Sequence, residues 1–318
     1  MPAEEAVEGQ QGRFKAFLRS SALPASAGVL TGAMLWLSFP PPDLGWLAFL
    51  ALLPMLFVVL TARRWYGAAV CALVAGMTGY SAALVWLGSV SWPGVFGAGL
   101  FLTAWLLLFV LAVRPMRPVL GAWWPLGAAA FWVGLELVRG RMEPAFGWLG
   151  MGYTQWRFDS LRQIASVGGF YAVSFVVVLV NAGFAAVLVE YYRRRTSEAR
   201  SGALRLASIS AACCVGVSVL ACFVGLGLGA GVDVYEGPVV GVVQPNTPLK
   251  AREVFLEDEE TIQARNQKTL HDAVDLSASL ADKAPALVAW PENTISMALN
   301  VSPRSEEHTS ELQSLLII

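Results

Sequence analysis

Apolar stretches long enough to cross a lipid bilayer occur repeatedly up to residue 232 and not after it. A bilayer core of about 30 Å is crossed by about 20 predominantly apolar residues in an α-helix. Charged residues make up only 14% of the chain, compared with roughly 25% in soluble globular domains. The sequence therefore predicts a polytopic α-helical membrane domain at residues 23–232, followed by a polar segment. About seven spans are expected, at residues 23–39, 44–62, 66–87, 95–113, 119–138, 163–189 and 206–232.

Positive charge is distributed unevenly along the chain. Residues 1–232 contain 16 Lys and Arg against 9 Asp and Glu, whereas residues 233–318 contain 6 against 14, which indicates two different environments. Basic residues occupy the N-terminal tail (1–22) and every second loop, whereas the loops at 40–43 and 88–92 have none. Cytoplasmic loops carry the excess of Lys and Arg. We therefore expect the spans in a bacterial inner membrane, a cytoplasmic N-terminus and a periplasmic segment after the last span.

The loop at residues 139–162 departs from this charge pattern. It is expected on the periplasmic side, yet it contains four arginines, including Arg139. Its middle part is apolar, glycine-rich and aromatic, with Trp148 and Tyr153, which favours a loop that dips into the membrane surface beside phospholipid headgroups. An interfacial anchor without a substrate role is the alternative. Glu136 lies three residues before Arg139, a helical spacing that permits pairing, so a structural ion pair and a functional carboxylate are both open.

Two short apolar runs and a helical pattern follow the last span. Residues 239–243 form a continuous valine-rich run, as expected of a β-strand that is covered on both faces. Residues 259–280 have the apolar spacing of a loosely amphipathic helix, and residues 286–290 form a second strand that Pro291 ends. Two strands and a helix cannot close a hydrophobic core. Residues 233–303 are therefore predicted to begin an α/β domain.

The cysteines and histidines lack the spacing of a metal site. All four cysteines, Cys71, Cys213, Cys214 and Cys222, lie in apolar stretches, where the reactive thiolate is disfavoured, and they are expected to act as packing residues. The two histidines are far apart and have no cysteine nearby, unlike zinc ligands. We therefore expect no metal, no cofactor and no nucleic-acid partner.

A carboxylate follows the second predicted strand directly, because Trp290 and Glu292 enclose a single proline. After the first strand, Gln244 begins a Gln-Pro-Asn turn. This order, a Gln-Pro-Asn turn, a helix and an apolar strand ending in Trp-Pro-Glu, resembles the beginning of the nitrilase superfamily, which has an αββα sandwich and a Glu–Lys–Cys triad. The resemblance implies that Glu292 is the general base toward a cysteine nucleophile. A partly buried carboxylate can accept the proton that the thiol must lose.

Motifs in the membrane domain make the chain similar to the apolipoprotein N-acyltransferases. They are Leu-Ser-Phe-Pro-Pro-Pro-Asp-Leu at 37–44, Glu-Leu-Val-Arg-Gly-Arg at 136–141, Phe-Gly-Trp-Leu at 146–149, Gly-Tyr-Thr-Gln at 152–155, and Gly-Gly-Phe-Tyr-Ala-Val-Ser-Phe at 168–175 with Asn181. Together with the nitrilase-like segment, the resemblance covers about residues 30–295. Two departures, Pro245 in place of a common glycine and Asn293 in place of a common threonine, remove no reacting group.

The resemblance implies a two-step acyl transfer in lipoprotein maturation. A phospholipid would acylate the nucleophilic cysteine, which forms a thioester and releases a lysophospholipid. The thioester would then acylate the α-amine of the N-terminal diacylglyceryl-cysteine of an apolipoprotein. A monomer in the lipid bilayer is expected. The candidates for the substrate-facing and lipid-facing side chains are Trp148, Tyr153, Trp290, Gln244 and Arg139.

The last part of the chain is expected to be foreign to the protein. Residues 304–314 match the translation of a sequencing-adaptor oligonucleotide, so we expect the natural sequence to end near Pro303 and residues 304–318 to carry no function. The lysine and the nucleophilic cysteine of the triad would then be absent, and this fragment would be inactive.

Two alternative hypotheses for the function are a membrane-tethered nitrilase-like amidase and a non-catalytic polytopic protein. The arginine- and aromatic-rich loop argues against the first, and the scarcity of charge within the spans argues against a transporter.

Overall fold

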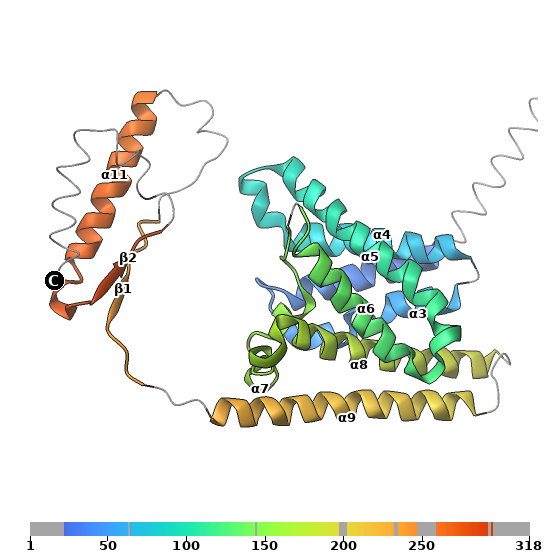
Figure 1. The fold of residues 1–318 in the computed structure, drawn as a ribbon. Coiled ribbons are helices and arrows are strands. Elements are labelled where there is room, and N and C mark those ends of the chain that lie inside the picture. The colour runs from blue at the N-terminus through green and yellow to red at the C-terminus, as the bar shows by residue number, and fades with distance from the viewer. Residues whose placement is uncertain are drawn as a thin grey trace, which may run out of the picture. The chain divides into compact units, whose positions relative to one another are not determined.

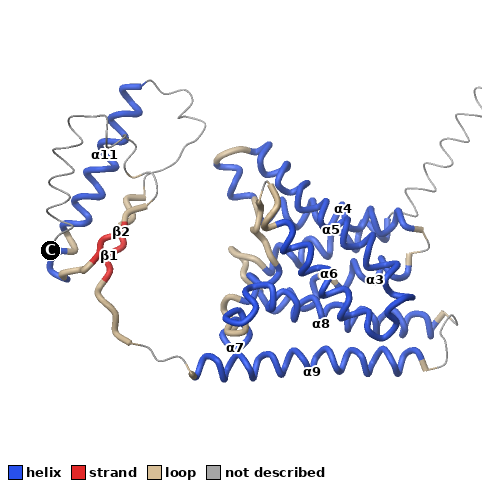
Figure 2. The backbone as a smooth tube through the Cα atoms, in the orientation of Figure 1, coloured by secondary structure: helices blue, strands red, loops and turns tan. Residues whose placement is uncertain are grey.

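The computed structural model describes residues 22–62, 64–143, 145–196, 202–231, 235–246, 259–291 and 294. The chain separates into two compact units, a helical unit (Met1–Gly88 and Trp92–Val232) and a small unit (Ser89–Ser91 and Asp233–Ile318). Figure 1 shows the helices and strands of each unit, and Figure 2 shows that strands occur in the small unit. Glu292, the tail at 304–318 and most of residues 1–22 lie outside the described residues.

The helical unit contains a helix within every predicted span. The first is Ala22–Ser38. The others, in chain order, are η1 (Gly45–Leu47), α2 (Ala48–Ala51), α3 (Leu53–Thr61), α4 (Trp65–Ala83), η2 (Val85–Ser89), α5 (Trp92–Leu120), η3 (Gly121–Trp123), α6 (Trp124–Arg139), η4 (Met151–Gln155), α7 (Asp159–Arg162), α8 (Ala165–Arg195) and α9 (Ala203–Ala230).

Four apolar stretches of the described chain are long enough to cross a membrane. They are Trp65–Ala83, Trp92–Arg139, Ala165–Arg195 and Ala203–Ala230, whereas Ala22–Ser38 and Gly45–Thr61 are shorter apolar helices. The stretch Trp92–Arg139 holds two of the predicted spans, α5 and α6, which are separated by η3. Gly121 in η3 has a φ of 54°, a backbone conformation that glycine adopts at little cost. The prediction of a multi-helix membrane protein is thus confirmed at this coarser level.

The break between α2 and α3 is held by a side chain from a distant helix. Asn181 on α8 is fully buried, and its Nδ2 donates to the Ala48 carbonyl (2.8 Å) while its Oδ1 accepts from the Leu52 amide (2.9 Å). Pro54, near the start of α3, has no N–H and so favours a new helix start. Because lipid cannot satisfy free backbone groups, the hydrogen bonds of Asn181 allow the chain to bend between α2 and α3 inside the unit.

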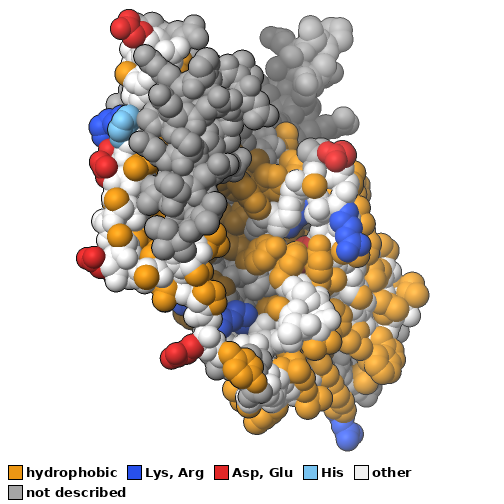
Figure 3. Space-filling model, turned by 60° about the vertical axis from the view of Figure 1, so that its left-hand side comes forward, with side chains coloured by type: hydrophobic (Ala, Val, Ile, Leu, Met, Phe, Trp, Pro, Cys, Tyr) orange, Lys and Arg blue, Asp and Glu red, His pale blue; other side chains and the backbone are white. Residues whose placement is uncertain are grey.

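Apolar side chains remain exposed along the surface of the helical unit. On α9 they include Leu220, Phe223 and Leu226, and only 17% of the most apolar part of α9 is buried in the protein. Figure 3 shows hydrophobic side chains gathered over the helical unit on the face it displays. Soluble monomers rarely expose apolar patches of this extent, so this surface fits contact with lipid.

The small unit is a β–α–β arrangement. Strand β1 (Val240–Val242) pairs in parallel with β2 (Leu287–Ala289), with Gly241 opposite Val288, and α11 (Glu259–Ala278) and η5 (Ala281–Lys283) connect them. The predicted strands and helix are therefore present, as a two-stranded parallel sheet.

The expectation that the first strand is covered on both faces is wrong for the described residues. Val240 and Val242 remain exposed, Val242 by 75%, whereas Val243 is buried. At Gly241, an added Cβ would lie 2.7 Å from the Leu280 side chain, so the segment after α11 packs closely on the other face. One apolar face of the sheet lacks a cover among the described residues.

Candidate functional site

The loop that follows α6 is fastened to the last turn of that helix by two buried charged side chains. Glu136 is 5% exposed, and its Oε1 accepts from Trp132 Nε1 (2.8 Å) and from the Met151 amide (2.7 Å). Arg139 is 4% exposed, and its Nη2 donates to the Trp148 carbonyl (3.1 Å). The two side chains therefore hold two backbone positions, three residues apart, against α6.

The ion pair that the spacing of Glu136 and Arg139 permits is not among the contacts of the described residues. Each side chain instead binds a backbone group of the loop. Glu136 Oε2 and Arg139 Nε are buried without a hydrogen-bond partner among the described residues. Arg139, expected to face substrate or lipid, thus lies inside the protein, where its hydrogen bond shapes the loop.

Glycines let the loop approach α8 closely. The Gly152 amide donates to Ser174 Oγ on α8 (2.7 Å), and a Cβ at Gly152 would lie 2.4 Å from the Phe170 carbonyl. The helix itself is kinked at Gly168 and Gly169, and Gly169 has a φ of 62°, which disfavours residues with a side chain. The kink and Gly152 together bring the backbone of the η4 segment against α8.

The aromatic side chains of the loop remain on its surface. Trp148 is 50% exposed, and its ring packs against Trp86 (centroids 5.1 Å apart) and Phe146 (5.3 Å). Tyr153 is 44% exposed and stacks on Phe170 with centroids 4.4 Å apart. Partial burial raises the pKa of Tyr153, with smaller contributions from nearby Tyr and Glu side chains. The loop thus presents anchored aromatic rings beside buried hydrogen bonds.

The end of the loop is attached to the hairpin before η1. Asp43 Oδ1 accepts from Trp156 Nε1 (2.9 Å), and the other carboxylate oxygen of Asp43 pairs with Arg157. Gln155 Nε2 donates to the Gly45 carbonyl (2.7 Å). A cavity of about 200 Å³ lies between these two segments. Asp43 and Gln155 lie in the motifs at 37–44 and 152–155, and their partners directly follow these motifs, but nothing in the sequence spacing predicted their contact.

The small unit places two of the candidate residues at one edge of its sheet. Gln244 and Trp290 each follow a strand, and the carboxyl ends of parallel strands meet at the same edge. Gln244 is exposed, whereas Trp290 is partly buried and its Nε1 donates to Ser277 Oγ on α11 (2.9 Å). Trp290 therefore anchors the end of β2 to the helix. The roles proposed for these residues, and for Glu292, stay predictions.

The helical unit matches a known family over the region that contains this loop. The family model of the apolipoprotein N-acyltransferase N-terminal domain matches residues 31–183. The chain is related to the apolipoprotein N-acyltransferases through the N-terminal domain of that family. The matched region includes the hairpin at Asp43, the clamp formed by Glu136 and Arg139, and Asn181.

Individual relatives of this chain carry the same family name. An apolipoprotein N-acyltransferase of Geobacter metallireducens is 33% identical over 177 residues, covering 50% of this chain and 33% of that protein. One of Rhodopirellula baltica is 26% identical over 293 residues, covering 86% and 49%, and one of Gloeobacter violaceus is 30% identical over 216 residues, covering 62% and 40%. The chain thus spans less than half of the length of these relatives.

Proposed function

We propose that this chain belongs to an enzyme that moves an acyl chain from a phospholipid to the α-amine of the N-terminal diacylglyceryl-cysteine of apolipoproteins. The observation that carries the proposal is the family match of residues 31–183. The proposal also places the helical unit in a bacterial inner membrane, with a cytoplasmic N-terminus and a periplasmic small unit. The basic loops support this orientation.

The proposed reaction has two steps. In the first, a cysteine thiolate attacks the ester carbonyl of the phospholipid, the thioester forms, and the lysophospholipid leaves as the alcohol. In the second, the amine of the acceptor attacks the thioester, the amide forms, and the thiol is regenerated. The nucleophile is none of Cys71, Cys213, Cys214 and Cys222, since they lie on α4 and α9.

The proposal assigns roles to residues of both units. Glu292 is the general base, and Trp290 fixes the end of the strand that leads to it, which its hydrogen bond to Ser277 supports. Trp148 and Tyr153 line the lipid entrance, which is supported by their exposure on a loop whose backbone is clamped. The hydrogen bonds of Glu136 and Arg139 to the loop backbone keep these large apolar rings in one place, so little conformational entropy is lost when they contact lipid.

The test replaces the proposed base. The natural gene that encodes residues 1–303 is re-read beyond the codon for Pro303 and expressed up to its own stop codon, and its membranes receive phosphatidylethanolamine and a diacylglyceryl-cysteine peptide. N-acylated peptide is measured by mass spectrometry. Glu292→Gln should lower the rate by about 10² or more, the range of general-base catalysis. Glu260→Gln, the same change at an exposed position on α11, is the matched control and should stay within about twofold of wild type.

Two outcomes would contradict the assignment. Wild-type transfer by Glu292→Gln would exclude this residue as the base. Release of free fatty acid or of an amide-hydrolysis product, without any N-acylated peptide, would favour a membrane-tethered hydrolase over an acyltransferase.

A further inference from the structure

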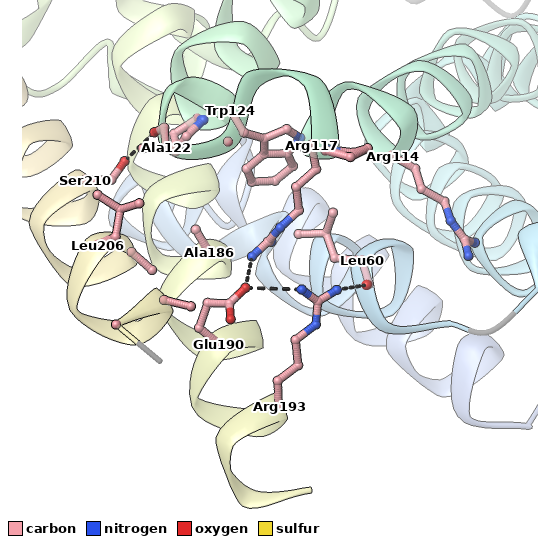
Figure 4. Close-up of a pocket in the computed structure, with 16 residues that line it drawn as sticks. Leu60, Arg114, Arg117, Ala122, Trp124, Ala186, Glu190, Arg193, Leu206 and Ser210 are labelled. Atoms are coloured by element: carbon pink, nitrogen blue, oxygen red, sulfur yellow. Dashed lines mark hydrogen bonds and ion pairs between the residues drawn. The ribbon is translucent and has the colours of Figure 1, made fainter. Parts of the chain in front are cut away.

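A cavity of about 950 Å³ opens in the helical unit at the start of α6, away from the loop. Helix α6 begins at Trp124, which lines the cavity, and ends at Arg139, which holds the loop. At 1.5 Å per residue, about 23 Å of helix separates the two places. Figure 4 shows the cavity, with side chains contributed by α3, α5, α6, α8 and α9.

The polar wall of the cavity has an excess of positive charge. Arg117 from α5 and Arg193 from α8 converge on Glu190, with N–O distances of 2.6 and 3.2 Å (Figure 4). Arg114 lies one helical turn before Arg117 and donates through Nη2 to the Ala62 carbonyl (2.6 Å). Glu190 is the one carboxylate against three guanidinium groups among the described residues that line the cavity. An anion in the cavity would therefore meet a net attraction.

Two of these guanidinium groups each have one nitrogen donor without an acceptor. Arg114 Nη1 and Arg117 Nη1 are buried and have no hydrogen-bond partner among the described residues. A buried donor that lacks an acceptor is destabilising, and more so when it is charged. Guanidinium donors at neighbouring positions match the oxygens of a phosphate group, to which arginine forms paired hydrogen bonds. The arginine side chains that line the cavity therefore favour a phosphate ester as the ligand.

Part of the wall is apolar. It includes Leu60, Trp124, Ala186, Leu206 and Ala207, side chains that carry no charge. A freely soluble phosphate would leave this wall uncovered, whereas a glycerophospholipid would place its glycerol and the first part of its acyl chains there. The cavity also lies where α5 and α8 end and α6 begins, which is where a bilayer would place its headgroups.

We propose that this cavity binds an anionic phospholipid, with its phosphate attracted by the positive charge of Arg114, Arg117 and Arg193 and its acyl chains along the apolar part of the wall. The site is distinct from the loop at the other end of α6. Lipid binding in this cavity does not depend on the acyl-transfer reaction. It requires only that the helical unit lies in a membrane and that the leaflet at this end of the unit contains anionic lipid.

The experiment measures lipid binding by the full chain in detergent. Phosphatidylglycerol is titrated, and bound lipid is counted by native mass spectrometry. The Arg114→Gln, Arg117→Gln double variant should bind about tenfold or more weakly, since two of the three positive charges of the cavity wall are lost. Arg205→Gln is the matched control, because Arg205 is exposed at the same end of the unit and does not line the cavity. It should change binding by less than about twofold.

A second variant separates binding from folding. Ala203→Trp adds bulk to the cavity wall and leaves every arginine in place, so it should also weaken phosphatidylglycerol binding about tenfold with an unchanged unfolding midpoint. Wild-type affinity in this variant or in the double variant would overturn the proposal, as would an equal loss in Arg205→Gln. Displacement of the lipid by millimolar inorganic phosphate would assign the cavity to a soluble anion instead and would also overturn it.

Discussion

Replacing Glu136 by leucine should release the loop from α6. The substitution removes the acceptor for two buried donors, the Met151 amide and Trp132 Nε1, which lie 2.7 and 2.8 Å from the same carboxylate oxygen. Each buried donor left without a partner costs about 1–3 kcal/mol. The free energy that keeps this segment closed should therefore fall by about 2–6 kcal/mol. Glu136→Gln retains an acceptor oxygen and should have a much smaller effect.

Hydrogen exchange measures this opening directly. Since about 1.4 kcal/mol corresponds to a factor of ten, the Met151 amide should exchange at least about 30-fold faster in Glu136→Leu when exchange is limited by local opening. A peptide from the middle of α9 serves as the internal control and should not change. Exchange at Met151 within about twofold of wild type would refute the conclusion that Glu136 clamps the loop.

Two further substitutions test the packing around α8. Asn181→Leu leaves the Leu52 amide and a carbonyl of α2 unpaired in the interior, so the free energy of unfolding should fall by about 2–6 kcal/mol; an unchanged unfolding midpoint in detergent would contradict this. Gly152→Ala places a Cβ 2.4 Å from the Phe170 carbonyl and should loosen the loop by about 1–3 kcal/mol, read as faster proteolysis. Gly147→Ala is its control, since nothing lies within 4 Å of a Cβ there.

The elements of this protein that follow from local pattern were predicted well. Long apolar runs gave helices such as α8 and α9, because a helix satisfies its backbone groups in lipid within a single segment of about 20 residues. The two valine- and alanine-rich runs gave the parallel strands β1 and β2. Their parallel pairing followed from the helical pattern between them, since a crossover helix returns the chain in the same direction.

Contacts between distant segments were not predictable from spacing. The pairing of Glu136 with Arg139 was considered because the two are helical neighbours, yet in the structure each binds a backbone group 9 to 15 residues further along the chain. Asp43 binds Trp156 across 113 residues, and no periodicity encodes that distance. The basic cavity was missed for the same reason: its arginines were counted as loop charges, not as neighbours in space.

The contact of Asn181 with the break between α2 and α3 has a consequence for how the protein is made. Asn181 is 129 residues after Leu52 in the chain. At a synthesis rate of about 5–20 residues per second, the asparagine is made about 6–26 s after its partner. During that interval the helical acceptor open to the Leu52 amide is the Ala48 carbonyl, four residues earlier, as in an unbroken helix. The bend between α2 and α3 is therefore fixed only after α8 has been made.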